Sequence, residues 1–267
     1  MIRLALKSIM LGNSVNMSDD LKNGISMVLL SYEEEENLRV LLPQIKEKLE
    51  ECGEYYEIIV VDSAEALDNT REVCEENGAR YVNQEGEGFG NAFRTGIRFA
   101  QHQKFFIMDT DGSHDPKYIP DIYHIFMREH ADVAIGSRYI EGGMTNDVIT
   151  SKIISRSLNK IYGVIIGIHA KDMSTDFRLY HTSGLKEVEP ELTGLHFDVV
   201  EEVLLRLKIK KSSMGKKIKV VETPIVFDER IFGKSKRNSF DLSIAYLTSF
   251  VRFTCLRLKA AFAGDRV

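Results

Sequence analysis

The stretch KFFIMDTDGSHDP, residues 104–116, decides the fold that this sequence is expected to adopt. Its apolar run, Phe105–Met108, is typical of a parallel strand that is buried on both faces of a sheet. Asp109 and Asp111 follow at the point where such a strand ends, and a helix is expected to begin after Pro116. The stretch therefore predicts a buried strand that presents two carboxylates at one edge of a sheet.

The flanking segments repeat this alternation of strand and helix. Apolar runs bounded by turn residues predict strands at residues 25–31, 56–62, 80–83, 104–108 and 132–136. Pro43 is expected to kink or restart the first helix. This spacing over residues 24–140 predicts an α/β fold with a doubly wound, mainly parallel sheet and helices on both faces. Ligands of such sheets bind beyond the carboxyl ends of the strands, where Asp62 and Asp109 are expected.

Three segments divide the chain. We expect an N-terminal leader at residues 1–23, one catalytic domain at 24–238 and an amphipathic helical extension at 239–267. Within the domain, helices are expected at 151–167 and 197–209 and a strand at 218–222. No stretch reaches the roughly 20 apolar residues of a membrane span, and Lys7 interrupts any signal-peptide core. We therefore expect a cytoplasmic protein, with contact at the cytoplasmic membrane face limited to peripheral binding.

Composition excludes several classes of protein. The net charge of -5 argues against a nucleic-acid-binding protein, although a local basic segment occurs near residue 230. The three cysteines are far apart and form no CxxC motif, so neither a disulfide framework nor a zinc site is expected. A chain of 267 residues is long enough to bury a large core without such cross-links.

Asp109-Thr110-Asp111 is the motif with the clearest chemistry. Two carboxylates two residues apart at a strand end can meet one hard cation, which also takes phosphate oxygens as ligands. A turn that caps a helix would use the same residue types. The apolar strand before the motif and the His-Asp-Pro sequence after it favour the metal interpretation.

Other candidate residues each have a structural alternative. Asp62 suits a ribose or base contact, but it would equally cap a helix. Gly88–Ala92 opens a helix whose N-terminus favours anions, and a tight turn explains it as well. The basic segment Arg230–Arg237 suits a mobile phosphate clamp or a solvated loop. Arg138 and Arg156 are further candidate phosphate ligands or surface residues.

The order of these motifs resembles that of the family-2 inverting glycosyltransferases, and within them the dolichol- or polyprenyl-phosphate mannose synthases. The resemblance covers roughly residues 25–237 and is strongest at residues 109–116 and Gly136–Gly143. The remaining matching segments are Ser31–Leu38, Glu57–Asp62, Gly88–Ala92, Asp172, Phe177–Tyr180, Glu222–Phe227 and Arg230–Lys236.

The resemblance implies a GT-A fold, a GDP- or UDP-sugar donor and Mg²⁺ or Mn²⁺ as cofactor. The nucleotide-binding residues that it implies are Ser31, Tyr32, Glu34, Asp62 and Asp109, and the metal ligands are Asp109, Asp111 and Ser113. The acceptor or phosphate ligands are Arg138, Arg156 and Ser235, and the catalytic residues are Asp111, Arg230 and Lys236.

Our hypothesis is a single displacement with inversion, in which the metal and the basic loop neutralise the leaving diphosphate. A polyprenyl or dolichyl phosphate acceptor is already anionic and needs arginines rather than a base. A sugar hydroxyl acceptor would need a base, for which Asp172 and Asp176 are the candidates. A nucleotidyltransferase would carry a glycine-rich loop with a lysine directly after the first strand. This sequence has Ser31–Glu34 at that position instead. A catalytically inactive nucleotide-binding protein remains a third interpretation.

The C-terminal extension carries Arg252, Arg257 and Lys259 among apolar residues. Such a helix can lie on a membrane surface, pack on its own domain or join two subunits into a homo-oligomer.

Overall fold

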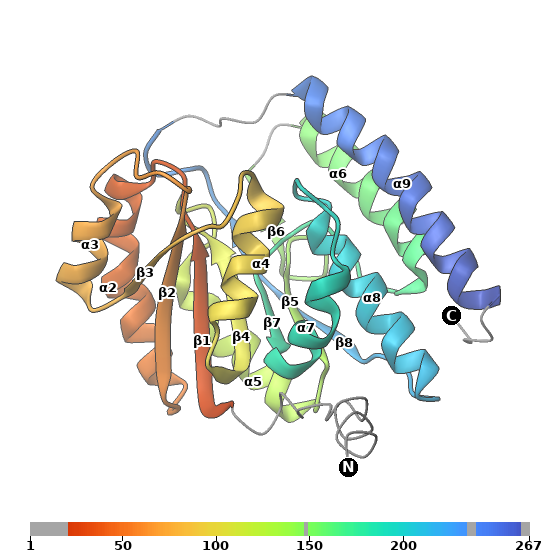
Figure 1. Ribbon diagram of the computed structural model, residues 1–267, viewed down its shortest axis with the longest axis horizontal. Helices are drawn as coiled ribbons and strands as arrows, with labels where there is room; N and C mark the ends of the chain where they lie inside the picture. Colours follow the sequence, from red (N-terminus) through yellow and green to blue (C-terminus); the bar gives the residue numbers. More distant parts are fainter. Residues whose placement is uncertain (1–20, 147–148, 234–238, 263–267) are drawn as a thin grey trace, which may run out of the picture.

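The computed structural model describes residues 21–146, 149–233 and 239–262. Seven strands form one sheet in the order β3-β2-β1-β4-β7-β5-β8, and β6 and β9 pair separately (Figure 1). The strands are β1 (Lys22–Leu30), β2 (Tyr56–Asp62), β3 (Arg80–Asn83), β4 (His102–Asp109), β5 (Val133–Ser137), β6 (Met144–Thr145), β7 (Arg178–His181), β8 (Val220–Pro224) and β9 (Val226–Phe227). The doubly wound, mainly parallel sheet predicted from the sequence is confirmed. β1 begins at Lys22, inside the stretch that we expected to be a leader.

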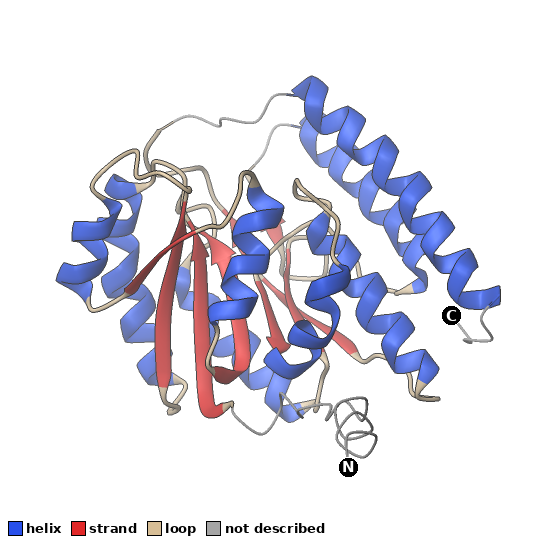
Figure 2. Ribbon diagram, viewed as in Figure 1, coloured by secondary structure: helices blue, strands red, loops and turns tan. Residues whose placement is uncertain are grey.

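Helices cover both faces of this sheet (Figure 2). They are α2 (Glu35–Glu51), α3 (Thr70–Asn77), α4 (Phe89–Phe99), α5 (Ile119–Arg128), α6 (Ile149–Tyr162), α7 (Thr182–Val188), α8 (Val199–Ser213) and α9 (Ser239–Phe262). Single turns lie at Pro116–Tyr118, Gly163–Gly167 and Glu189–Glu191.

Strand β7 was not predicted from the sequence. It is only four residues long, and it runs antiparallel to both of its neighbours, β4 and β5. Neither a long apolar run nor a βαβ spacing marks such a strand. Its position in the sheet therefore depends on pairing with strands that are distant in the sequence.

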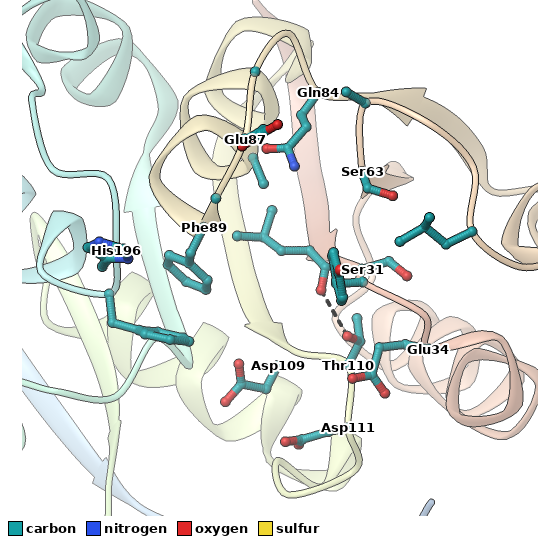
Figure 3. Close-up of a pocket in the computed structure, with 18 of the residues that line it drawn as sticks. Ser31, Glu34, Ser63, Gln84, Glu87, Phe89, Asp109, Thr110, Asp111 and His196 are labelled. Carbon is teal, nitrogen blue, oxygen red and sulfur yellow. Dashed lines mark hydrogen bonds between the residues drawn. The ribbon is translucent and has the colours of Figure 1, made fainter. Parts of the chain in front are cut away.

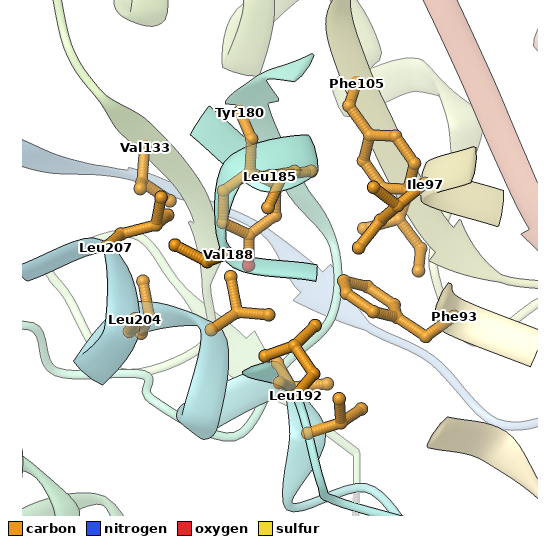
Figure 4. Packing of buried hydrophobic residues seen from close by; sticks show 14 of the residues in the cluster. Phe93, Ile97, Phe105, Val133, Tyr180, Leu185, Val188, Leu192, Leu204 and Leu207 are labelled. Atoms are coloured by element: carbon orange, nitrogen blue, oxygen red, sulfur yellow. The ribbon is translucent and has the colours of Figure 1, made fainter. Parts of the chain in front are cut away.

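Two apolar cores, one on each face, follow from the alternation of side chains along the strands. On β1, Met27 and Leu29 join the core beneath α2 and α5, whereas Val28 joins the opposite core. The second core includes Phe93 of α4, Phe105 of β4, and residues of α7 and α8 (Figure 4). Because both faces of the sheet are buried, the sequences of its strands are continuous apolar runs.

Helix α2 continues through Pro43 as one element, so the restart that we considered does not occur. Proline costs roughly 3 kcal/mol in a helix interior. Five buried side chains of α2 each contribute about 1.5–3 kcal/mol and outweigh that cost; they are Leu38, Leu41, Leu42, Ile45 and Leu49. Pro43 itself lies on the exposed face, where water can hydrate the carbonyl group left without a donor.

The C-terminal helix α9 packs against the end of α6 (Figure 1). Phe253 is fully buried beside Tyr162, whose hydroxyl lies 2.8 Å from the Ser249 hydroxyl. One side of α9 is therefore part of the domain core. Within the described residues, no helix combines the length and the apolar character needed to cross a membrane.

Candidate active site

The carboxyl ends of β1, β2 and β4 open into a cavity of about 790 Å³ (Figure 3). This is the edge at which open α/β sheets bind their ligands. The side chains that line it follow directly after these strands or come from later loops. They include Ser31, Tyr32, Glu34, Ser63, Gln84, Asp109, Thr110, Asp111, His196, Phe197 and Arg230. Six of the predicted site residues therefore share one cavity.

The turn after β4 is held in place by its own hydrogen bonds. The Thr110 hydroxyl donates to the carbonyl oxygen of Leu30 at 2.8 Å, which joins the ends of β4 and β1. The Ser113 amide and hydroxyl both donate to Asp111 Oδ1, at 3.0 and 2.5 Å. Gly112 has φ of 83°, a conformation that glycine adopts without strain. Ser113 is thus committed to orienting Asp111 and is itself buried.

Arg230 joins the distant basic loop to this turn. Its guanidinium donates to Glu34 Oε1 at 2.6 Å and lies 2.9 Å from Asp111 Oδ2. Burial works to raise the pKa of the Asp111 carboxyl, but the Ser113 hydrogen bonds and the charge of Arg230 outweigh it and hold that pKa below its usual value. The structure thus brings the predicted acids and the start of the basic loop together. Lys236 and Ser235 lie outside the described residues.

Asp109, His114 and Asp176 form a cluster whose ligand atoms lie within 4.8 Å of one another. The Asp109 amide donates to His114 Nδ1 at 3.1 Å, which leaves the proton of the neutral ring on Nε2, 3.3 Å from the Thr175 hydroxyl. Burial lowers the pKa of His114, which favours this neutral form. The histidine is therefore a buried support of the turn, and the oxygen atoms of the cluster come from Asp109 and Asp176.

Asp62 does not line the cavity, although we expected it to bind the nucleotide. Its carboxylate accepts hydrogen bonds from the Ser63 amide at 2.8 Å and the Tyr81 hydroxyl at 3.0 Å. Burial raises the pKa of Asp62 despite these bonds. The neighbouring Ser63 and Gln84 line the cavity in its place, because Asp62 points back toward β3.

Arg138 and Asp172 are committed to each other. The guanidinium Nε and Nη2 donate to the two carboxylate oxygens at 2.7 and 2.8 Å, and Asp172 is fully buried. Burial works to raise the pKa of Asp172, but Arg138 outweighs it and holds that pKa low. Asp172 is therefore not placed to serve as a base, which corrects our expectation. Arg156 is exposed, and its guanidinium carbon lies 5.3 Å from the centre of the Tyr139 ring.

One wall of the cavity was missed from the sequence. Residues 193–197, here called the wall loop, contribute His196 and Phe197 to the lining. The Phe197 ring lies 4.4 Å from that of Phe89, and the Gly90 amide donates to the carbonyl oxygen of Leu195 at 2.9 Å. No motif or charge run marks this loop. Its only available signal was the pair of glycines, Gly88 and Gly90, against which it packs.

Comparison with known proteins shows the family. The model of the glycosyl transferase family 2 matches residues 26–189, which is more than half of the chain. The chain belongs to glycosyl transferase family 2. The match confirms the enzyme class expected for this family 2 glycosyltransferase, and most of the residues that line its cavity lie within the matched range.

Two similar proteins carry a lipid phosphate in their names. The enzyme is 31% identical over 219 residues to a dolichol-phosphate mannosyltransferase of Pyrococcus furiosus. The aligned region covers 79% of this chain but only 58% of the relative. It is 28% identical over 222 residues to an undecaprenyl-phosphate mannosyltransferase of Micrococcus luteus, covering 78% and 85% of the two chains. The chain thus spans little more than half of the Pyrococcus protein.

Solved structures share the fold. Glucosyl-3-phosphoglycerate synthase of Mycobacterium tuberculosis, in complex with Mn²⁺, UDP and glucosyl-3-phosphoglycerate, has a TM-score of 0.64 at 16% identity. The match covers 87% of this chain and 80% of the synthase. The GT-A-type fold is confirmed by this likeness.

Proposed function

We propose that this enzyme transfers a hexose from a nucleoside-diphosphate sugar to a polyprenyl or dolichyl phosphate, with inversion. The observation that carries the proposal is the convergence of Asp109, Asp111 and Arg230 at one cavity edge. The names of the relatives from Pyrococcus furiosus and Micrococcus luteus support the lipid phosphate acceptor.

The polar groups of the lining support one orientation of the proposed donor. Ser31, Glu34 and Ser63 surround the end of the cavity opposite the wall loop (Figure 3). Hydroxyl and carboxylate groups suit the ribose and the base. The diphosphate would then lie between Asp109 and Arg230, and the sugar beneath His196 and Phe197.

A divalent cation fits this part of the cavity, because its carboxylates supply the hard oxygen ligands that Mg²⁺ and Mn²⁺ prefer. Asp109 and Asp111 would hold it, and Asp176 is the further carboxylate within reach of Asp109. When bound, such a cation offsets negative charge on the donor diphosphate. Among the described residues, Arg230 is the only lysine or arginine that lines the cavity.

The reaction forms a bond from an acceptor oxygen to the anomeric carbon as the bond to the donor diphosphate breaks. The bonding electron pair leaves with the diphosphate, toward which Arg230 contributes positive charge. A phosphate acceptor needs no proton removal.

A sugar hydroxyl acceptor is the second candidate. It is favoured by Asp176, the carboxylate that shares a cluster with Asp109 and could take the hydroxyl proton. Asp172 does not fill that role because Arg138 holds it.

We further propose that the outer face of α6 and α9 rests on an anionic membrane. Its exposed apolar side chains are Ile153, Ile154, Val164, Leu247, Val251 and Phe262. Arg156, Lys160 and Lys259 are exposed beside them, and residues 152–162 and 246–262 contain no acid. Apolar anchors with basic residues suit an anionic bilayer. The free thiols of all three cysteines suit its reducing, cytoplasmic side.

Liposome flotation tests this surface. The Leu247→Asp/Val251→Asp variant should lose binding to anionic vesicles, whereas Met127→Asp, an exposed change on α5, should retain it. Binding equal to that of the unaltered enzyme would reject the membrane surface. A dimer that dissociates in the Leu247→Asp/Val251→Asp variant would instead assign this face to a second copy.

A panel of GDP- and UDP-sugars with Mn²⁺ tests the transferase proposal. Each donor is assayed with polyprenyl phosphate and, separately, with soluble sugars. We expect product only on polyprenyl phosphate, loss of turnover in Asp111→Ala, and no loss in Asp121→Ala, an exposed change on α5. Product on soluble sugars alone would select the second candidate. No turnover and no donor hydrolysis with any donor would indicate an inactive nucleotide-binding protein.

A further inference from the structure

Arg252 connects the C-terminal helix α9 to the residues that hold the wall loop. Its Nη2 lies 2.5 Å from Asp198 Oδ2 and 3.2 Å from Glu202 Oε2. The two carboxylate side chains are only 7% and 1% exposed. A guanidinium shared by two buried carboxylates fixes both more firmly than a surface ion pair would.

The same two carboxylates bind the backbone of the wall loop. Asp198 Oδ1 accepts the His196 amide hydrogen at 3.1 Å. Glu202 accepts the Thr193 amide at 3.1 Å and the Gly194 amide at 2.7 Å. Asp198 therefore uses one oxygen for the wall loop and the other for Arg252, whereas Glu202 Oε2 meets both Arg252 and the two loop amides.

The wall loop carries this arrangement to the cavity. Gly194 and Leu195 pack against the start of α4, where Arg94 also donates to the Gly194 carbonyl oxygen at 2.9 Å. His196 then lies on the side of the cavity away from Ser63 (Figure 3), and Phe197 lines the cavity beside it. A shift of Asp198 or Glu202 would move these side chains, because the backbone between them is short.

We propose that Arg252 is a positioning residue, through which α9 sets the wall loop against the cavity. Removal of Arg252 leaves Asp198 buried without its cation, whereas Glu202 keeps Arg206 at 3.3 Å. The uncompensated Asp198 carboxylate turns toward water and releases the His196 amide. The wall loop then loosens at its cavity end while the rest of the domain remains folded.

A tryptophan probe tests the position of the loop without any substrate. The chain contains no tryptophan, so Phe197→Trp reports the wall loop alone. Adding Arg252→Ala should raise the acrylamide quenching constant about twofold, as expected for a locally opened segment. The matched control is Arg257→Ala, on the same helix, which donates to the carbonyl oxygens of Val164 and Ile165 instead. It should leave the quenching unchanged.

Two results would overturn the proposal. One is equal quenching with and without Arg252→Ala. The other is an equal rise in both arginine variants, which would indicate detachment of α9 as a whole. Leu195→Trp, at a side chain already 54% exposed, replaces the probe if Phe197→Trp does not fold. Thermal unfolding of each variant separates local opening from general instability.

Kinetics give the second measurement, and this arm rests on the proposed transferase function. Arg252→Ala should lower kcat/KM roughly tenfold and raise the donor KM, since small misplacements of a binding wall reduce rates strongly. Arg252→Lys should recover part of the loss, because lysine keeps the charge but reaches one carboxylate at a time. An unchanged donor KM with a lower kcat would reject the positioning role. A change in quenching together with no turnover on any donor would support the positioning of the wall loop by Arg252. The same result would reject the transferase proposal.

Discussion

A methyl group at Gly90 should push the wall loop away from the start of α4. A Cβ atom there would lie 2.0 Å from the Gly194 carbonyl oxygen and 2.9 Å from Leu195 Cα. Both atoms are backbone, so no side-chain rotation can remove the overlap. Ordinary contact begins near 3.4 Å, and the wall loop must therefore move by about 1.4 Å.

The net effect of Gly90→Ala follows from opposing terms. Alanine favours the first turn of α4 by about 1 kcal/mol over glycine. Overpacking costs roughly 1–3 kcal/mol, and losing the hydrogen bond from the Gly90 amide to Leu195 costs about 1 kcal/mol more. We expect a net loss of about 1–3 kcal/mol in the free energy of unfolding. A displacement of this size at the cavity should lower kcat/KM about 100-fold.

Urea unfolding and sugar transfer from the donor measure both effects. Gly184→Ala in α7 is the matched control, because its Cβ would meet only the Leu207 side chain, at 3.3 Å. The control should be at least as stable as the unaltered enzyme and equally active. If Gly90→Ala kept the unaltered midpoint and a rate within about twofold, the argument from wall contact would be wrong.

Three further predictions concern single side chains. Burial raises the pKa of the Glu201 carboxyl from 4.5 to about 8. The stability that the neutral carboxyl contributes is therefore complete below pH 4.5 and is lost as the pH rises toward 8, because the buried carboxyl then ionises. Glu201→Gln should therefore gain about 3 kcal/mol over the unaltered enzyme at pH 7 and nothing near pH 4.5, by urea unfolding at both values; a gain that does not vary with pH would contradict this. Arg230→Lys should lower kcat/KM at least about tenfold, since one ammonium cannot span Glu34 and Asp111 as the guanidinium does; full activity would remove Arg230 from the site. Asp62→Asn should change the donor KM by less than about threefold, which corresponds to under 1 kcal/mol; a larger rise would return Asp62 to the nucleotide site.

Much of the sheet was predictable because its strands are buried on both faces. Continuous apolar runs mark β1, β2, β4 and β5, and the acids that end β4 were assigned to the cavity edge. The short antiparallel β7 has no such run and was missed. Asp62 was assigned to the right strand end, but the direction of its side chain depends on Tyr81, which no local pattern reveals.

The sequence by itself determined the α/β class, the family and the position of the Asp-Thr-Asp turn, because apolar periodicity and short motifs are local properties of the chain. Only the tertiary structure decided which charges meet. Arg230 and Glu34 are 196 residues apart, and Arg252 and Asp198 are 54 apart, yet each pair shares a hydrogen bond. Such contacts depend on the path of the whole backbone and on the burial that strengthens an ion pair, and neither is written in any single segment.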